Sequence, residues 1–301
     1  LFTTLFFIFS SFQTLFGLSI IVRVIIKILN AKPLEAELLE LEKLQKLNNK
    51  EGKSQSLTLL KDKKDKIEFV KIIFNNLKNE IGYAEDIELM IVDSSSVNAI
   101  SLGRFKHSHK ICLTKGSLEK LEERELRALL YHELFHIVNM DTDYLTTISG
   151  TFASPMLFFT LSKNTIKNLY KIKGKIRPSE YYKRFFLALL VLLISSLFLP
   201  LAFLTNIFVS VSKEFDADNF SLQKVGKDEL LSLFEKVKLN CVSFESNYFF
   251  MKTLFFSHPN CKDLSKKMNR IFDTYPSLEE RIELIKSKVS NVSNINTKDL
   301  T

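Results

Sequence analysis

The sequence predicts an α+β protein that is mainly helical and that carries two to three transmembrane helices. Two short apolar runs are typical of strands, and a longer stretch repeats its apolar residues at helical spacing. Segments 1–22, 144–162 and 185–212 contain no charged residue, although 25% of the 301 residues are charged. The hydrophobic fraction of 46% is ordinary for a globular protein. The average therefore conceals apolar segments within a hydrophilic chain.

The three uncharged segments are candidates for crossing a bilayer, which takes about 20 apolar residues for a ~30 Å core. Segments 1–22 and 185–212 are rich in Phe, Leu and Ile, whereas 144–162 is more polar. A buried core helix is the alternative for 144–162 and 185–212. The first segment lacks the basic start and the cleavage site of a signal peptide. Because the chain begins with Leu, we expect its natural N-terminus to be missing.

Basic residues between the second and third uncharged segments complicate the topology. Such residues favour the cytoplasmic side of a membrane, and basic residues also follow the first segment. If 144–162 and 185–212 both cross, the two basic stretches lie on opposite faces, so charge does not decide the orientation. Alternatively, 144–162 enters the bilayer without crossing. The basic side chains of this loop are Lys163, Lys167, Lys171, Lys173, Lys175, Arg177, Lys183 and Arg184.

The remaining composition excludes several classes of protein. The counts of Phe (27), Gly (8) and Cys (3) exclude a disordered chain, a collagen-like repeat and a disulfide scaffold. The net charge is +8, but the lysines are spread along the chain and no basic-aromatic RNA motif occurs, so we expect no nucleic-acid partner. An odd number of cysteines argues against a disulfide framework and favours a reducing compartment. They are Cys112, Cys241 and Cys261.

The stretch between the first two uncharged segments combines helical and strand patterns. The runs IELMIV, 87–92, and KICLT, 110–114, are short and apolar, as strands are. A turn-rich stretch, 93–103, separates them. From about 122 to 140 the apolar residues recur at helical spacing. Before the first strand we expect a helix at 33–47, a polar linker at 48–56 and a second helix at 57–80.

The predicted helix at 122–140 carries a chemical motif. His132 and His136 are four residues apart, so both imidazoles project from one face and can bind one tetrahedral zinc ion. Glu133 flanks the same face, where it can act as a general base toward water. Two neutral ligands and a base on one rigid helix are what metal-assisted hydrolysis requires. The motif therefore predicts a zinc hydrolase.

A catalytic zinc ion takes a third protein ligand and keeps one open position. Glu214 and Asp218 follow the third uncharged segment and lie four residues apart, on one helical face. Glu214 could bind zinc while Asp218 orients a ligand histidine through a hydrogen bond. The alternative is that both are acids at a helix N-terminus, where they favour the helix dipole.

Four stretches in this order resemble the HtpX-type membrane zinc endopeptidases, relatives of the CAAX prenyl protease. The resemblance covers roughly residues 85–286 and includes the order of zinc helix, two hydrophobic segments and glutamate. The stretches are Asn98-Ala99 with Gly103 and ICLTKG, then EERELRALLYHELFHIVNMD, then EFDAD at 214–218, and TYPSLEERI at 274–282.

The resemblance implies a zincin-like metalloprotease domain with one zinc ion per chain. Its ligands would be His132, His136 and Glu214, with Glu133 as the general base. Asp218 would hydrogen bond to a ligand histidine. The substrate backbone would add as a strand beside the residues Asn98 and Ala99, although Asn98 could also be a simple loop amide.

The sequence departs from the family pattern at two positions. Val211 stands where the family often has Arg, and Tyr275 stands where it has a His that helps to stabilise the oxyanion. We hypothesise that the Tyr275 hydroxyl takes over this hydrogen bond, although Tyr275 could be only a buried aromatic. His258 is the competing candidate, and Arg281, which the family retains, could assist. The loop histidines His107 and His109 are expected to be solvated.

The same reasoning predicts how the domains are organised. Segment 1–22 is an N-terminal transmembrane segment, and 23–143 and 213–290 are two halves of one catalytic domain. For these halves to complete one metal site, the intervening 144–212 must cross the membrane an even number of times. The tail, 291–301, is expected to be disordered.

We therefore expect an integral protein of an inner or plasma membrane, in contact with the lipid bilayer, with its site on the cytoplasmic side. The expected activity is hydrolysis of peptide bonds in misfolded or membrane proteins. A selective processing protease of the CAAX prenyl protease kind is the first alternative, and a catalytically weak membrane scaffold is the second. A scaffold would be expected to lose Glu133 or a ligand, and the sequence retains them all.

Overall fold

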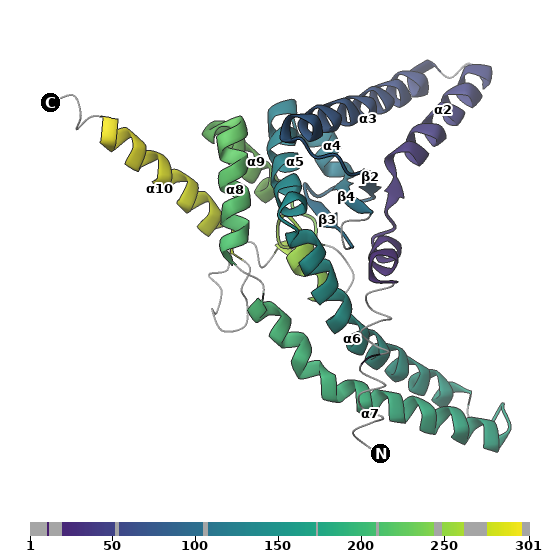
Figure 1. Ribbon diagram of the computed structural model, residues 1–301. Helices are drawn as coiled ribbons and strands as arrows, with labels where there is room; N and C mark the ends of the chain where they lie inside the picture. Colours follow the sequence, from purple (N-terminus) through teal and green to yellow (C-terminus); the bar gives the residue numbers. More distant parts are fainter. Residues whose placement is uncertain are drawn as a thin grey trace.

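The computed structural model describes residues 11, 20–51, 54–104, 108–172, 174–208, 211–243, 249–261 and 276–296. These residues form a mainly helical α+β fold around one small sheet, which confirms the mainly helical α+β part of the predicted fold class. Figure 1 shows helices on both sides of the sheet and a pair of long helices that runs away from it.

The sheet has four strands in the order β1-β2-β4-β3. They are β1 (Lys32–Pro33), β2 (Ile87–Val92), β3 (Ala99–Leu102) and β4 (His109–Thr114). β2 and β4 pair in parallel, and the other two pairings are antiparallel. β2 and β4 confirm the two predicted strands, whereas β3 lies within the stretch predicted to be turn-rich. Its four residues are all buried, so no alternation of apolar and polar residues marks it.

The two faces of the sheet pack against different helices because successive side chains of a strand point to opposite faces. One face packs against α3 and α5 and is formed by Leu89, Ile91, Ala99, Ile111 and Leu113. The other packs against the helix at 20–28 and against Leu254 and Phe255, and is formed by Met90, Val92, Ile100, Leu102 and Cys112.

Two long helices precede the sheet. α2 (Leu34–Glu51) and α3 (Ser54–Ile81) replace most of the predicted polar linker at 48–56 with helix. The reason is that this polar stretch contains no proline, and its Lys, Glu and Gln residues are good helix formers. The linker prediction was therefore wrong for all but 52–53, which lie outside the described residues.

The helix that carries the histidine motif, α5 (Glu123–Val138), lies at the centre of the molecule (Figure 1). A capping box fixes its start: the Glu122 side chain accepts from the backbone of Glu125, whose own side chain accepts from the Glu122 N–H. α4 (Lys115–Lys120) precedes it. α8 (Val211–Val225) and α9 (Lys227–Leu239) pack against α5 on the side away from the sheet.

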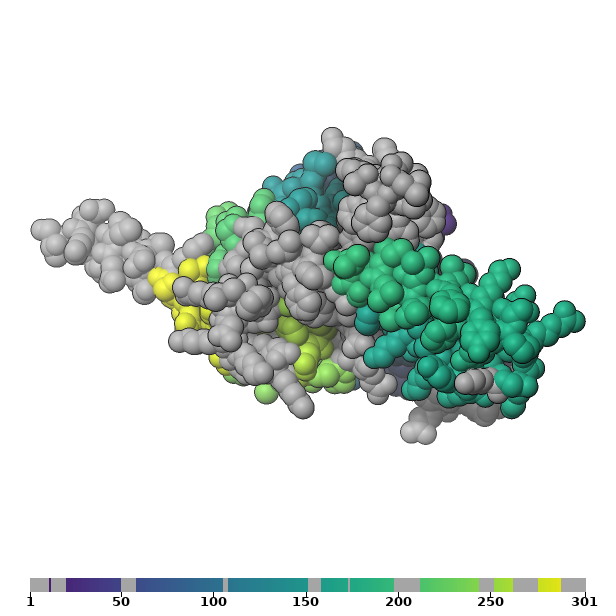
Figure 2. All heavy atoms as spheres, turned by 90° about the horizontal axis from the view of Figure 1, so that it is seen from below, coloured from purple at the N-terminus to yellow at the C-terminus, as the bar shows by residue number. Residues whose placement is uncertain are grey.

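The second uncharged segment lies in α6 (Asp141–Lys171), and the third lies in α7 (Pro178–Phe208) as far as 208. The two helices run side by side and form an arm that projects from the body (Figure 1), seen from below as a lobe beside it (Figure 2). Within the described ranges, no helix combines the length and the apolar content needed to cross a membrane. Most of the predicted span at 1–22 lies outside the described residues.

Two predictions about the C-terminal part were wrong. α10 (Leu278–Asn296) continues as a helix into the tail predicted to be disordered from 291; residues 297–301 lie outside the described residues. Cys241 and Cys261 form a disulfide, whereas Cys112 is free and buried in the sheet. The odd number of cysteines did not reveal this pair because one buried thiol is simply left over. The 3-10 helix η1 (Phe249–Leu254) lies between Cys241 and Cys261 in the sequence.

Candidate metal centre

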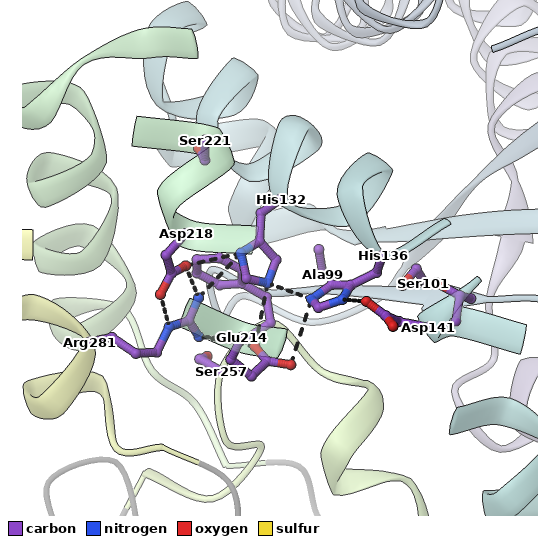
Figure 3. A network of polar contacts seen from close by, with 12 residues as sticks. Ala99, Ser101, His132, His136, Asp141, Glu214, Asp218, Ser221, Ser257 and Arg281 are labelled. Atoms are coloured by element: carbon purple, nitrogen blue, oxygen red, sulfur yellow. Dashed lines mark hydrogen bonds and ion pairs between the residues drawn. The ribbon is translucent and has the colours of Figure 1, made fainter. Parts of the chain in front are cut away.

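Three predicted ligand side chains meet in one buried cluster. His132 and His136 project from α5, and Glu214 reaches them from the first turn of α8 (Figure 3). The two Nε2 atoms are 3.2 Å apart, and the Glu214 carboxylate oxygens lie 3.5 Å from His132 Nε2 and 3.6 Å from His136 Nε2. The three side chains are between 1% and 5% exposed. Their ligand atoms lie within 4.8 Å of one another.

Packing of α8 against α5 brings this cluster together. Residues one helical turn apart share a face, so His132 and His136 point in the same direction. On α8 the Ser221 hydroxyl donates to the backbone oxygen of Ala128 on α5 at 2.8 Å, which fixes the two helices side by side. Ala217, on the same helix between Glu214 and Ser221, is fully buried.

A carboxylate stands behind each imidazole. Asp218 Oδ1 lies 3.0 Å from His132 Nδ1, and Asp141 Oδ2 lies 3.4 Å from His136 Nδ1. When each Nδ1 carries the proton and hydrogen bonds to its carboxylate, the Nε2 lone pairs on the Glu214 side are left for a metal ion. Two nitrogen donors and one carboxylate facing a common point suit a divalent metal ion with an open coordination position. The residues present therefore fit the metal that the motif predicts.

The sequence reasoning missed Asp141. It lies five residues after His136, at the first residue of α6, and its other oxygen pairs with Lys213 at 3.1 Å. An acidic residue in the first turn of a helix is common because it interacts favourably with the helix dipole, so its presence there does not indicate a metal site. The available signal was its place at the end of the stretch that resembles the family motif.

Arg281 lies on the Asp218 side of the cluster, only 1% exposed. Its Nε and Nη2 donate to the two Asp218 oxygens at 2.7 and 2.6 Å, and Nη1 donates to the backbone oxygen of Phe256. Burial alone would raise the pKa of Asp218, but Arg281 and His132 outweigh it and lower the pKa to about 2. Arg281 thus keeps Asp218 ionised as the partner of His132.

Glu133 faces the same cavity as the ligands, as predicted for a general base. Its Oε1 is buried and has no hydrogen-bond partner within the described part of the chain. Burial raises the pKa of Glu133 above its usual range. The cavity has a volume of about 10 Å³ and is lined by Ser101, His132, Glu133, His136, Thr142, Leu145, Glu214, Thr253, Leu254, Phe255 and Phe256.

The predicted substrate-binding residues lie at the outer edge of the sheet, next to this cavity. Ala99 begins the edge strand β3, and Asn98 directly precedes it. The Asn98 side chain is 3% exposed and is bonded to the backbone of Ser257. Asn98 and Ala99 therefore have the chain's own residues as their partners, and one of these, Phe256, lines the cavity.

Three other predictions have different outcomes. Tyr275 lies outside the described residues. His258 lies in a turn, where its Nδ1 accepts from the Asn260 N–H at 3.1 Å, and it does not line the cavity. The prediction that His109 is solvated was wrong: it begins β4, is 2% exposed and contacts Asp143 and Tyr83. His107 lies outside the described residues.

Comparison with known proteins agrees with this geometry. Residues 68–289 match the family model of peptidase family M48. Protease HtpX of Wigglesworthia glossinidia brevipalpis is 27% identical over 239 residues, 77% of each chain. The Protease HtpX homolog of Bacillus subtilis is 26% identical over 215 residues, 71% of this chain and 67% of the relative. The chain therefore belongs to peptidase family M48 and is a metalloprotease of the HtpX type.

Proposed function

We propose that this protein is a membrane-anchored zinc endopeptidase that hydrolyses peptide bonds in misfolded or membrane proteins. The observation that carries the proposal is the convergence of His132, His136 and Glu214 beside the unpartnered oxygen of Glu133. The retention of every one of these groups argues against a catalytically weak scaffold.

His132, His136 and Glu214 would hold one zinc ion. When bound, the ion supplies a Lewis acid that polarises the scissile carbonyl and makes water more acidic. Asp218 and Asp141 contact the two imidazoles at Nδ1, which would leave each Nε2 to bind the ion. The pKa of Glu214 is lowered because the two histidines and Arg281 outweigh its burial, so its carboxylate stays available as a ligand.

Glu133 performs the proton transfer. Its Oε1 accepts a proton from the attacking water, and the raised pKa of the buried carboxyl makes the carboxylate a stronger base. The same oxygen then donates the proton to the leaving amine nitrogen, so that one residue serves both halves of the reaction. Among the described residues this oxygen has no hydrogen-bond partner, so no existing bond must break before it accepts the proton.

The experiment compares the wild type with Glu133→Gln in cleavage of unfolded casein by detergent-purified protein with added zinc. Glu133→Gln keeps the size of the side chain but removes the base, so we expect at least a 100-fold loss of kcat with unchanged zinc content. Equal cleavage by both proteins would mean a contaminating protease. Cleavage of casein also separates broad degradation from selective processing, which would spare it.

The arm supports contact with a lipid bilayer. On α7 the exposed apolar residues Phe186, Leu190, Leu193 and Leu197 recur every three or four residues, so they form one stripe on the helix. A stripe of this kind outside a folded body is a membrane or protein contact surface. We expect Leu190→Glu with Leu193→Glu to reduce co-flotation with anionic liposomes; unchanged flotation would contradict this role.

We place the catalytic domain on the cytoplasmic side of an inner or plasma membrane, following the family resemblance. The Cys241–Cys261 disulfide counts against this placement, because disulfides rarely persist in reducing compartments. Leu39 lies exposed on α2 and gives a direct test. On the cytoplasmic side, a Leu39→Cys variant should react with a membrane-impermeant maleimide only after the cells are permeabilised, and labelling of intact cells would reverse the placement.

A further inference from the structure

We propose that residues Thr253–Ser257, the last two residues of η1 and the three that follow it, here called the strap, form a self-inhibitory segment that occupies the place of the substrate strand. A substrate must displace the strap before its scissile bond can reach Glu133. This inference rests on the proposed peptidase function and describes how the same site is regulated.

The strap bonds to the sheet as an added strand would. Ile100 of β3 and Phe255 form an antiparallel bridge, and the Phe256 N–H donates to the Ala99 oxygen at 2.9 Å. β3 is the last strand of the sheet, so its outer edge is where an extended peptide could add. That edge is taken by the protein's own backbone.

The amide of Asn98 extends the same pairing by one residue. Its Nδ2 donates to the Ser257 oxygen at 3.0 Å, and its Oδ1 accepts from the Ser257 N–H at 3.2 Å. Both ends of the amide group are thus bonded to one backbone unit, the arrangement expected for an Asn that grips an extended peptide. A substrate that uses Asn98 has to replace Ser257.

The strap also closes the cavity. Thr253, Leu254, Phe255 and Phe256 form one wall of it, and the Phe256 ring packs edge-on against the His132 ring at 4.7 Å between centroids. The remaining volume, about 10 Å³, holds roughly one water molecule. Glu133 is 1% exposed. No peptide can reach it in this arrangement.

Contacts of Phe255 and Phe256 hold the strap in place. Arg281 donates to the Phe256 oxygen and stacks its guanidinium 4.6 Å from the centre of the Phe256 ring. Phe255 packs into the core beneath the second face of the sheet. Displacing the strap breaks these contacts but leaves Asp218, another partner of Arg281, in place beside His132.

A reversible crosslink tests the proposal. Ile100 and Phe255 are directly opposite in an antiparallel pair, where Cα atoms lie about 4.5–5.5 Å apart, within the range for a disulfide. The variant is Ile100→Cys with Phe255→Cys, made with Cys112→Ser because Cys112 pairs with position 100 across β3 and β4. Its oxidised form holds the strap on the sheet.

We expect the oxidised variant to cleave casein at least 50-fold more slowly than the same protein after reduction. Wild type and Ile100→Cys with Cys112→Ser, each with and without reductant, control for the native disulfide and for the substitutions. An oxidised variant as active as its reduced form would overturn the proposal. Cleavage by wild type but not by Glu133→Gln establishes the peptidase separately, so the two ideas fail independently.

A second measurement does not depend on turnover. Hydrogen exchange is followed in Glu133→Gln, alone and with saturating unfolded casein. We expect the amides of Phe256 and Ser257 to lose protection when casein binds, while amides in the middle of α5 keep theirs. Strap amides that stay protected in the complex would show that substrate binds without displacing the strap, and the proposal would be wrong.

Discussion

Asp141→Asn tests whether the carboxylate that the sequence reasoning missed tunes the metal site. The change keeps the size of the side chain and removes its charge. Hydrogen-bonding partners of ligand histidines typically contribute 10–100-fold to metal affinity. The Asp141–His136 contact is long, at 3.4 Å, and Asp141 also pairs with Lys213 near the surface. We therefore expect Asp141→Asn to lose zinc affinity by ~10-fold, the low end of this range, which corresponds to about 1.4 kcal/mol of binding free energy.

Asp218→Asn gives the upper end of the same scale. The Asp218–His132 contact is 3.0 Å, and Asp218 is 2% exposed, with Arg281 fixed on its far side. We expect a ~100-fold loss of zinc affinity, about 2.7 kcal/mol. The variant also removes the closest counter-charge of the buried Arg281 guanidinium and leaves it with Glu214 at 3.8 Å. Its unfolding midpoint should therefore fall, whereas that of Asp141→Asn should change little.

Zinc affinity is measured by competition with a chromophoric chelator at fixed pH. Asp216→Asn is the matched control, because Asp216 is exposed on the same helix as Asp218 and should change the affinity less than about twofold. Wild-type affinity in Asp141→Asn beside weakened binding in Asp218→Asn would refute the role given to Asp141. A larger loss in Asp141→Asn than in Asp218→Asn would refute the argument from distance and burial.

Further predictions concern stability, measured as urea unfolding midpoints. Buried Glu125 accepts a hydrogen bond from Lys236 at 2.6 Å, and such bonds outweigh burial and lower the pKa of Glu125. Glu125→Gln should therefore lower the free energy of unfolding by about 2 kcal/mol above pH 5, and by progressively less as the pH falls below 4.5. A difference in stability that stays constant with pH would contradict this. Cys241 and Cys261, 20 positions apart, close a loop with their disulfide, and replacing both with Ala should lower the free energy of unfolding by about 3 kcal/mol. Under reducing conditions the wild type should be no more stable than this variant. Gly116→Ala would place Cβ 2.2 Å from a backbone oxygen and should cost roughly 3 kcal/mol; an unchanged midpoint would contradict the close approach.

The elements that could be predicted from sequence are those with a long local pattern. α5 repeats its apolar residues over four turns, and β2 (IELMIV) and β4 (HKICLT) each contain a short, mostly apolar run. β3 has only four residues and is held by its neighbours, so local pattern does not reveal it. The helix ends of α2 and α10 extend into polar stretches because these contain no strong helix breaker at the predicted boundary.

The site divides in the same way. His132, Glu133 and His136 follow from spacing on one helix, whereas Glu214 is 78 positions beyond His136 and needed the family resemblance. The position of Arg281 behind Asp218 depends on where α10 begins relative to α8, which no local pattern specifies. The strap was not foreseen for the same reason. Its pairing with β3 joins residues more than 150 positions apart.

The arm is joined to the metal centre at its base, not appended to it. The first turn of α6 contacts the site in succession: Asp141 bonds to His136, Thr142 to Ser101 of β3, and the next residue to His109 of β4. At the other end, α7 stops six residues before Glu214. Truncating the arm would therefore remove the partner of a ligand histidine and release the segment that positions the third ligand. It follows that deleting α6 and α7 should weaken metal binding together with the membrane contact proposed for the arm.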